Sequence, residues 1–321
     1  MIEFKKIELE DKEIINKYFF KTKFNNAEKN FSNLFMWRHT YEYEYIELDG
    51  CLCIRGKTRD TKETFYHFPY GNCKEQLIEK ILEKIALSEK LNENNEDDKL
   101  NKENKNENKY NKLLIKPVLP EMKECLEKQV NIEKFEIVED RNSFDYIYTT
   151  TKLIELKGKK FRTKRRWVKK FIENYNYTYE NITKENLKEA KEFTLNIIKD
   201  SNNDKDELMA MTEMFDNLFA LNITGCIIRV DGEIVGVSAG EAITDDTILI
   251  HCERANRDYE GIYNFINQEF IKREWSDYKY VNREEDLGIE GLRYAKMKYQ
   301  PDNLLTKYIA VLKEDKCLSF D

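Results

Sequence analysis

Two halves of this 321-residue chain repeat one order of predicted elements, and this repeat restricts the fold more than any other feature. In the second half the hydrophobic pattern predicts a strand, two helices, three antiparallel strands, a helix, a strand, a helix and a final strand. The first half shows the same order less clearly. The sequence therefore predicts an α+β protein of two tandem domains, residues 1–140 and 141–321, each with a mixed, mainly antiparallel sheet flanked by helices.

The second half shows the repeat best. Leu187, Ala190, Thr194 and Ile197 recur at helical spacing, and Asp231-Gly232 is a turn between two β-prone runs. The predicted elements are a strand at 177–182, helices at 184–198 and 206–220, strands at 225–230, 233–243 and 247–253, a helix at 261–275, a strand at 278–282, a helix at 289–299 and a strand at 304–311.

The first half contains a segment with nothing to bury. Residues 88–112 are almost wholly Asn, Glu, Lys and Asp, so we predict a disordered loop within the domain. Asp49-Gly50, between two β-prone runs, predicts a hairpin. The other predicted elements are strands at 2–9, 43–48, 51–55, 64–68, 113–116 and 135–138, and helices at 11–19, 74–87 and 121–129.

Composition excludes several classes of protein. The formal net charge of −7 argues against a surface coated for nucleic acid, and leaves room for a local basic patch. Seven cysteines without C-x-x-C spacing indicate reduced thiols. No run of about 18 apolar residues occurs, so we expect no transmembrane segment and a cytoplasmic protein. No histidine and carboxylate pattern has metal-ligand spacing, so no metal site is predicted.

The segment 157–170 holds nine Lys or Arg residues and no acid. Phosphates of RNA, coenzyme A or a lipid headgroup are natural partners for such density. Trp167 and Phe161 could stack on a base. The alternative is a solvated helix face whose apolar residues pack inward.

The stretch from Tyr280 to Pro301 carries the densest set of candidate catalytic groups. After a short predicted strand come Arg283, Glu284, Glu285 and Asp286. A strand that ends in a charged turn and leads into a helix is a common place for binding groups. Within that helix we expect Leu292, Ala295 and the Met297/Tyr299 region to face a core, while Arg293 and Lys296 share a side at i, i+3. An ordinary solvated turn is the alternative.

Four segments carry a resemblance to a known family. They are F-S-N-L-F-M-W-R at 31–38, L-K-G-K-K-F-R-T-K-R-R at 156–166, H-C-E-R-A at 251–255 and N-R-E-E-D-L-G-I-E-G-L-R-Y-A-K at 282–296. The chain resembles an uncharacterised bacterial family related to the phosphatidylglycerol lysyltransferase C-terminal domain and, more distantly, to Fem-type aminoacyltransferases. The resemblance implies two tandem GNAT-like (acyl-CoA N-acyltransferase-like) domains. In the lysyltransferases such a domain moves an aminoacyl group from transfer RNA to a lipid headgroup.

His251 and Glu253 alternate on a predicted strand and therefore point to the same side. The unperturbed pKa of histidine suits proton transfer near neutral pH. A core histidine satisfied by a hydrogen bond is the alternative. In the GNAT-like fold the strand at 278–282 lies beside the strand at 247–253, so we expect the charged turn near His251.

Residues 254–263 stand where a coenzyme A-dependent GNAT enzyme carries its pyrophosphate loop, Q/R-x-x-G-x-G/A. Such a loop offers backbone N–H groups at a helix N-terminus to phosphate. Here Gly261 matches the first glycine, but Asp258 would repel phosphate and Tyr263 would crowd it, while Arg257 offsets this in part. The departure argues against ordinary acetyl-coenzyme A use and agrees with the aminoacyltransferase relatives.

We therefore predict an acyl-group transferase that moves an aminoacyl group from aminoacyl-tRNA to an amine or hydroxyl acceptor, either a small molecule or a lipid headgroup, without a further cofactor. The predicted catalytic residues are His251, Glu284, Asp286 and Arg283, and the predicted substrate-binding residues are Glu253, Arg293, Lys296, Lys164, Arg165 and Arg166. Glu284, Asp286 or His251 would take the acceptor proton, and Arg283, Arg293 or Lys296 would stabilise the oxyanion. Lys164, Arg165 and Arg166 would hold phosphates of tRNA. A coenzyme A-dependent N-acyltransferase and a non-catalytic ligand-binding protein remain open alternatives.

Overall fold

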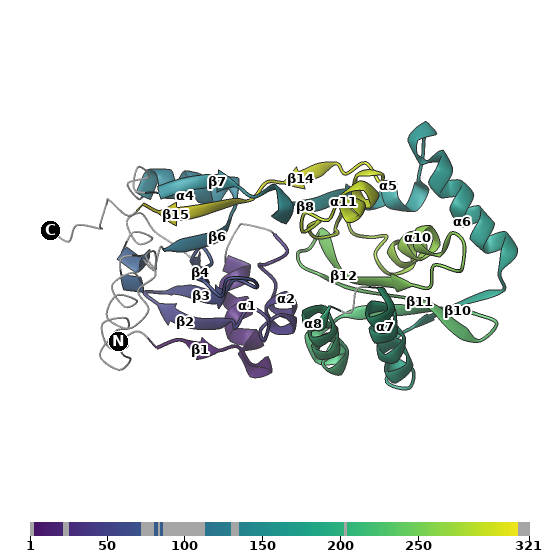
Figure 1. The fold of residues 1–321 in the computed structure, drawn as a ribbon, viewed down its shortest axis with the longest axis horizontal. Coiled ribbons are helices and arrows are strands. Elements are labelled where there is room, and N and C mark those ends of the chain that lie inside the picture. The colour runs from purple at the N-terminus through teal and green to yellow at the C-terminus, as the bar shows by residue number, and fades with distance from the viewer. Residues whose placement is uncertain are drawn as a thin grey trace, which may run out of the picture. The chain divides into compact units, whose positions relative to one another are not determined.

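The computed structural model describes residues 3–21, 26–71, 80–82, 84–85, 113–129, 135–201 and 204–313. It divides into two compact units, one made of Met1–Arg141 with Thr306–Asp321 and the other of Asn142–Leu305. The predicted loop at 88–112 lies outside the described residues, as does most of the predicted helix at 74–87. Figure 1 labels most of the elements of both units.

The first unit is built on a mixed sheet with the strand order β1-β2-β3-β4-β6-β15-β7, and β5 also pairs with β3. Its elements are β1 (Lys5–Lys6), η1 (Leu9–Asp11), α1 (Lys12–Lys21), α2 (Phe31–Met36), β2 (Glu44–Leu48), β3 (Cys51–Lys57), β4 (Thr64–Tyr66), β5 (Tyr70–Gly71), β6 (Leu114–Val118), α4 (Pro120–Gln129), β7 (Phe135–Glu139) and β15 (Tyr308–Leu312). The predicted strand at 2–9 is wrong in length, because the backbone N–H of Glu8 donates to Asp11 at 2.9 Å and the chain turns there into η1.

The second unit has the strand order β14-β8-β13-β12-β11-β10-β9. Its elements are β8 (Asp145–Thr149), α5 (Thr150–Glu155), η4 (Lys159–Phe161), α6 (Arg162–Asn174), β9 (Tyr177–Asn181), α7 (Leu187–Ser201), α8 (Lys205–Asp216), α9 (Leu218–Leu221), β10 (Thr224–Val230), β11 (Glu233–Ala242), β12 (Thr247–Ala255), α10 (Ile262–Glu274), β13 (Tyr280–Asn282), α11 (Glu290–Met297) and β14 (Asn303–Leu305). The prediction of an α+β fold with two mixed, mainly antiparallel sheets flanked by helices is confirmed.

The two sheets have the same topology, but only the first takes its sixth strand from a distant part of the chain. Reading each sheet from β1 or from β9, the fourth and fifth strands form the one parallel pair, and the sixth strand runs antiparallel to both of its neighbours. The sixth strand of the second sheet is β8, which follows β7 of the first unit in the chain. The sixth strand of the first sheet is β15, which follows β14 of the second unit.

The C-terminal strand therefore joins a different unit from the one that the sequence indicated. The single strand expected at 304–311 is two strands, β14 and β15, in two different sheets. Thr306 and Lys307 separate the two strands and belong to neither. The ammonium group of the buried Lys307 binds the carboxylate of Glu28 at 2.7 and 2.8 Å. Hydrophobic periodicity predicts that a segment is a strand, but it does not say which sheet the strand joins.

Helices cover both faces of the second sheet, as Figure 1 shows for α7 and α8 on one side and α10 on the other. Cys226, Ile228 and Val230 of β10 alternate onto the α10 side and share a core with Phe265 of that helix. The ring of Phe171, from α6, stacks on Phe265 with 4.5 Å between ring centroids. These contacts fix α6 and α10 to the sheet that carries the candidate site.

The helix α11 packs in the opposite sense to the one its sequence suggests. We expected Leu292, Ala295 and the Met297/Tyr299 region to face a core, but Leu292, Ala295 and Met297 are exposed and only Tyr299 is buried. Lys296 is buried and Arg293 half-buried instead. The reason is local, because the turn before the helix presents a buried carboxylate and several backbone carbonyls that need cationic donors.

Candidate active site

The second sheet opens between β12 and β13. The two strands pair in parallel over three residues each and then separate. Just past this point His251 is the extra residue of a β-bulge in β12, opposite Gly240 of β11. A Cβ atom on Gly240 would lie 2.5 Å from the carbonyl oxygen of Leu249, so the bulge requires glycine there. Bulges re-aim a side chain and are common beside active sites.

His251 lies between two carboxylates. Its Nε2 is 2.8 Å from Oε1 of Glu241 and its Nδ1 is 3.4 Å from Oε1 of Glu284, while its side chain is 1% exposed. Burial disfavours the imidazolium, but the carboxylates of Glu241 and Glu284 outweigh burial and raise the pKa of His251 to about 9. At neutral pH the imidazole is therefore protonated and both of its N–H groups face acids. As expected, the charged turn lies beside this histidine.

Glu253 is held from two elements. Its Oε1 accepts a hydrogen bond from Nη2 of Arg283 at 3.0 Å, and its Oε2 accepts one from Nδ2 of Asn267 in α10 at 3.0 Å. Burial disfavours the guanidinium, but the charge of Glu253 outweighs it and raises the pKa of Arg283. The Arg283 guanidinium also lies 5.1 Å from the centre of the Tyr299 ring.

Lys164 is the residue of the basic helix that turns toward this site. Its Nζ lies 3.3 Å from the centre of the Tyr299 ring. Burial, with the charge of Arg283 nearby, lowers the pKa of Lys164 to about 8. Lys164 and Arg283 thus flank one aromatic ring with Glu253 as their neighbouring carboxylate. Two cations against one carboxylate suit a ligand phosphate or a developing oxyanion.

Asp286, by contrast, is fully engaged with the protein. Its carboxylate is completely buried and accepts hydrogen bonds from the Tyr146 hydroxyl at 2.6 Å, the Gly288 N–H at 2.9 Å and the Arg293 guanidinium at 2.7 and 2.9 Å. Burial disfavours the ionised carboxyl, but these bonds outweigh it and hold the pKa of Asp286 well below its usual range. The geometry favours an anchoring role for Asp286 and Arg293 over contact with substrate.

Lys296 is likewise turned to the backbone. Its Nζ donates to the carbonyl oxygens of Arg283 at 2.6 Å and Glu284 at 3.2 Å, and also to that of Glu285. Burial lowers the pKa of Lys296. One ammonium thus gathers three successive carbonyls and fixes the turn that presents Arg283 and Glu284.

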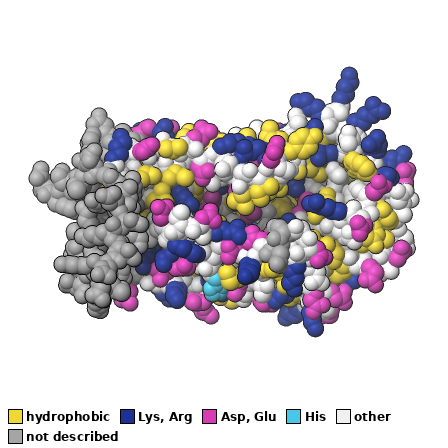
Figure 2. Space-filling model, in the orientation of Figure 1, with side chains coloured by type: hydrophobic (Ala, Val, Ile, Leu, Met, Phe, Trp, Pro, Cys, Tyr) yellow, Lys and Arg dark blue, Asp and Glu magenta, His cyan; other side chains and the backbone are white. Residues whose placement is uncertain are grey.

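The three basic residues expected to hold phosphates point in different directions, since successive residues of an α-helix are about 100° apart. Lys164 faces Tyr299, and Arg166 is exposed beside the ring of Trp167. Arg165 donates to the carbonyl oxygens of Leu156 and Gly158, the latter at 2.9 Å. Figure 2 shows Lys and Arg side chains gathered over the part of the molecule where α6 lies.

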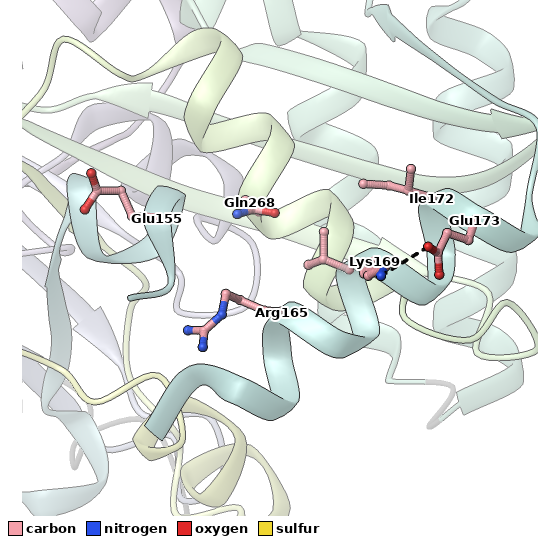
Figure 3. Close-up of a pocket in the computed structure, with 7 residues that line it drawn as sticks. Glu155, Arg165, Lys169, Ile172, Glu173 and Gln268 are labelled. Carbon is pink, nitrogen blue, oxygen red and sulfur yellow. Dashed lines mark ion pairs between the residues drawn. The ribbon is translucent and has the colours of Figure 1, made fainter. Parts of the chain in front are cut away.

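Arg165 also borders a cavity of about 270 Å³ between α5, α6 and α10. Its lining side chains, most of them labelled in Figure 3, are Glu155, Arg165, Val168, Lys169, Ile172, Glu173 and Gln268. Lys169 and Glu173 pair along the helix at 3.4 Å, and Gln268 donates to the carbonyl of Ile154. The polar groups of this cavity are therefore largely bonded to the protein, and none belongs to the His251 cluster.

The N-terminus of α10 is covered by α6. Gly261, its N-cap, has φ +89°, and a Cβ atom there would lie 2.2 Å from the carbonyl oxygen of Trp167. Nearby N–H groups are occupied, since Ile262 donates to the Tyr259 carbonyl and Glu260 to the Tyr175 hydroxyl, each at 3.2 Å. This glycine thus serves close helix packing where a pyrophosphate loop would need open N–H groups.

The first unit also has a bulge, and its buried histidine has different neighbours from His251. Between the pairs Arg55–Tyr66 and Leu52–Tyr70, β3 advances three residues while the opposite chain advances four, so one residue is extra. The residues between these pairs on the opposite chain are His67, Phe68 and Pro69, and Nδ1 of the buried His67 lies 3.1 Å from the Tyr70 hydroxyl, whereas His251 lies between two carboxylates. The acid-base cluster therefore belongs to the second unit.

Three contacting residues were not predicted from the sequence: Glu241, Asn267 and Tyr299. Glu241 could have been predicted, because a carboxylate in an otherwise apolar strand needs a hydrogen-bonding or charged partner when it is buried. Among the described residues no three His, Cys, Asp or Glu side chains are grouped to hold a metal ion. The described helices also include none with the length and apolarity that crossing a membrane requires.

The chain is similar to proteins of one known family. A family model described as phosphatidylglycerol lysyltransferase, C-terminal, matches residues 111–311. A curated relative, an uncharacterised protein of Mycoplasmoides gallisepticum, is 22% identical over 176 residues, which are 52% of this chain, and the chain spans only 56% of that protein's length.

Solved structures extend the likeness. A conserved protein of unknown function from Bacteroides thetaiotaomicron has a TM-score of 0.81 and 34% identity, covering 98% of this chain and 100% of its own. The C-terminal domain of a putative lysylphosphatidylglycerol synthetase from Agrobacterium fabrum has a TM-score of 0.62 and 13% identity, with 96% and 92% covered. FemX has a TM-score of 0.55 and 10% identity, covering 98% of this chain and 98% of its own. The repeated topology and these neighbours bear out the tandem GNAT-like fold.

Proposed function

Because this chain belongs to the phosphatidylglycerol lysyltransferase C-terminal family, we propose that its second unit transfers an aminoacyl group from aminoacyl-tRNA to an amine or hydroxyl acceptor. The observation that carries the proposal is the opening of the second sheet, where Glu284 contacts His251 and the adjacent Arg283 binds Glu253, with Lys164 near Arg283 and Glu253. This cluster combines a proton-transfer pair with oxyanion stabilisation, which acyl transfer needs.

In the proposed reaction the acceptor nitrogen or oxygen attacks the ester carbonyl carbon, and the bond from that carbon to the ribose oxygen breaks. Glu284, with its side chain 25% exposed, takes the acceptor proton and returns it to the ribose oxygen. His251 is almost wholly buried behind Glu284 and acts as a positioning residue, since its imidazolium orients the carboxylate and stabilises its charge. Arg283 and Lys164 stabilise the tetrahedral oxyanion.

The exposed basic residues of α6 would hold the tRNA. Arg162, Arg166 and Lys169 are exposed at i, i+4 and i+7 and so share one side of the helix. Phosphate contacts of this kind position a nucleic acid without reading its sequence. Use of aminoacyl-tRNA would place the reaction in the cytoplasm.

Two variants separate donor binding from chemistry. We expect R162Q/R166Q/K169Q to weaken binding of aminoacyl-tRNA about tenfold and to reduce the salt slope by about 2 to 3, because each lost phosphate contact removes about 0.7 to 0.9 from that slope. E284Q should leave binding unchanged and lower transfer about 100-fold or more. Binding is measured by filter retention across salt concentrations, and transfer with a polyamine or phosphatidylglycerol vesicles as acceptor.

The matched control K184Q/K188Q/K199Q removes three exposed charges elsewhere in the same unit and should change neither measurement. Equal loss of binding in this control would contradict the assignment to α6. Calorimetric binding of acetyl-coenzyme A without binding of tRNA would favour an N-acyltransferase. Binding of tRNA with no transfer that depends on Glu284 would favour a non-catalytic binding protein.

A further inference from the structure

Glu241 is a buried carboxylate with a single partner. It ends the buried run of β11, whose other members from Val235 to Gly240 are apolar or small. Its Oε1 lies 2.8 Å from Nε2 of His251, and among the residues that the structure describes its side chain has no other hydrogen bond or ion pair. A buried carboxylate with one such contact is costly, and an apolar residue would stabilise the fold as well or better. The presence of Glu241 therefore calls for a reason other than stability.

The backbone brings His251 and Glu284 together from two sides. The bulge in β12 aims His251, while Glu284 has φ +55°, in the left-handed region that residues other than glycine rarely adopt. The N–H of Glu284 donates to Oδ1 of Asn282 at 2.8 Å. Its carbonyl oxygen accepts from the Tyr146 N–H and from Nζ of Lys296, each at 3.2 Å. A strained residue that its surroundings hold in this way is typical of functional sites.

Glu241, His251 and Glu284 thus form one line of contacts. Nδ1 of His251 is 3.4 Å from Glu284, on the other side of the ring from Glu241. The exposed fraction of the side chain is 11% for Glu241, 1% for His251 and 25% for Glu284. A substrate therefore meets this line first at Glu284, and Glu241 can act on the reaction only through the imidazole.

The other charged groups described near His251 have partners of their own. These are Glu253 with Arg283, Glu207 of α8 with Arg254, and Lys296 with the carbonyl oxygens of the turn after β13. The charge on His251 is therefore controlled mainly by Glu241 from β11 and Glu284 from that turn.

We propose, on the premise of the proposed function, that Glu241 is a positioning residue of the transfer reaction and keeps His251 charged and directed at Glu284. While Glu284 is ionised, two carboxylates flank one imidazolium. When Glu284 takes the acceptor proton, Glu241 remains as the counter-charge, so the buried imidazolium is never left unpaired. Glu284 can then give that proton to the ribose oxygen, while His251 keeps its own two protons throughout.

The charge on His251 can be measured directly, because the chain has only three histidines. His39 is exposed, and burial lowers the pKa of His67 to about 3. By NMR of protein labelled with ¹⁵N-histidine, the signal that H251N removes should titrate with a pKa of about 9. In E241Q this pKa should be lower by about 1 to 3, because a neighbouring carboxylate favours the charged form by that much. E241D keeps a carboxylate on a shorter side chain and should titrate between the two.

Transfer should follow the same titration, once corrected for spontaneous hydrolysis of the aminoacyl ester. In the unaltered protein the rate should fall above about pH 9, where His251 loses its proton and Glu284 its charged partner. In E241Q the fall should begin about 1 to 3 pH units lower, so that transfer near pH 8 is reduced about tenfold while tRNA binding is unchanged. In an H251N background E241Q should have no further effect, since Glu241 acts through the imidazole.

The matched control is E274Q, which removes a half-buried carboxylate of α10 that accepts a hydrogen bond from the Tyr179 hydroxyl at 2.8 Å. It should alter neither the titration of His251 nor the pH profile of transfer. An unchanged titration of His251 in E241Q would overturn the inference, and so would a shifted titration with an unchanged profile of transfer. Circular dichroism checks that E241Q is folded, and E241D decides in the same way if it is not. Absence of transfer in the unaltered protein would overturn the proposed reaction and this role together, whereas the first two outcomes leave the reaction standing.

Discussion

At the scale of residues, two carboxylates in one turn have different surroundings. Asp286 accepts four hydrogen bonds and has no exposed surface, whereas Glu284 is 25% exposed and contacts His251 at 3.4 Å. A carboxylate saturated by donors is a poor proton acceptor, because protonation would break those bonds. This contrast assigns the anchor to Asp286 and the chemistry to Glu284.

Replacement of Asp286 by Asn should lower the free energy of unfolding by about 1 to 3 kcal/mol at pH 7, since the buried carboxylate loses its charge-assisted hydrogen bonds. The pKa of Asp286 is depressed in the folded state, so its contribution to stability is present above the unfolded pKa of about 4 and is lost as pH falls below it. Urea unfolding at several pH values should therefore show the two proteins converging below about pH 4. Asp277→Asn, at an exposed position, is the control, and a constant difference down to low pH would contradict the account.

Several residues of the candidate site could be predicted from the sequence, but the directions of the side chains on the basic helix could not. His251, Glu253, Arg283 and Glu284 could be identified, because neighbouring strands in a known element order bring their ends together. The sequence could not show whether Lys164 or the adjacent Arg165 faces the site, because both belong to one basic run. Only the packing of α6 decides which of its sides faces the site.

At the scale of elements, local sequence patterns predict most helices and strands, but they do not always predict which side of a helix is buried. The amphipathic rule assumes that apolar residues turn inward. In α11 the rule fails because Asp286 and the carbonyls of the preceding turn bind Arg293 and Lys296 more favourably than they could bind apolar groups. Only knowledge of those buried acceptors could have reversed the expectation.

The cost of close helix packing at Gly261 can be separated from the cost of its positive φ angle by comparison with Gly232. Gly261 and Gly232 have nearly equal φ angles, +89° and +91°, but a Cβ atom at Gly261 would strike the Trp167 carbonyl and one at Gly232 would meet no atom within 4 Å. Gly232→Ala should therefore cost only the strain of a positive φ, about 1 to 2 kcal/mol. Gly261→Ala should cost about 1 to 3 kcal/mol more, because α6 and α10 must move apart. Urea unfolding measures both, and equal losses would contradict the packing account.

At the scale of the whole molecule, the second unit is one continuous segment of the chain and the first unit is two, because β15 joins the first sheet. The segment Asn142–Leu305 contains every strand of the second sheet, from β8 to β14. The segment Met1–Arg141 lacks β15, the strand that lies between β6 and β7. Without β15, those two strands lose their shared neighbour and expose unpaired backbone groups.

Separate fragments should therefore behave differently. Residues 142–305 should unfold cooperatively with the circular dichroism of a folded α+β domain. Residues 1–141 should not fold until a peptide spanning 306–313 is added, because β15 pairs with β6 on one side and with β7 on the other. A peptide with Ala310 replaced by Asp is the control and should not restore folding. Ala310 is completely buried, so the Asp carboxylate would lose its hydration. Cooperative unfolding of 1–141 without any peptide would show that the first sheet does not depend on its borrowed strand.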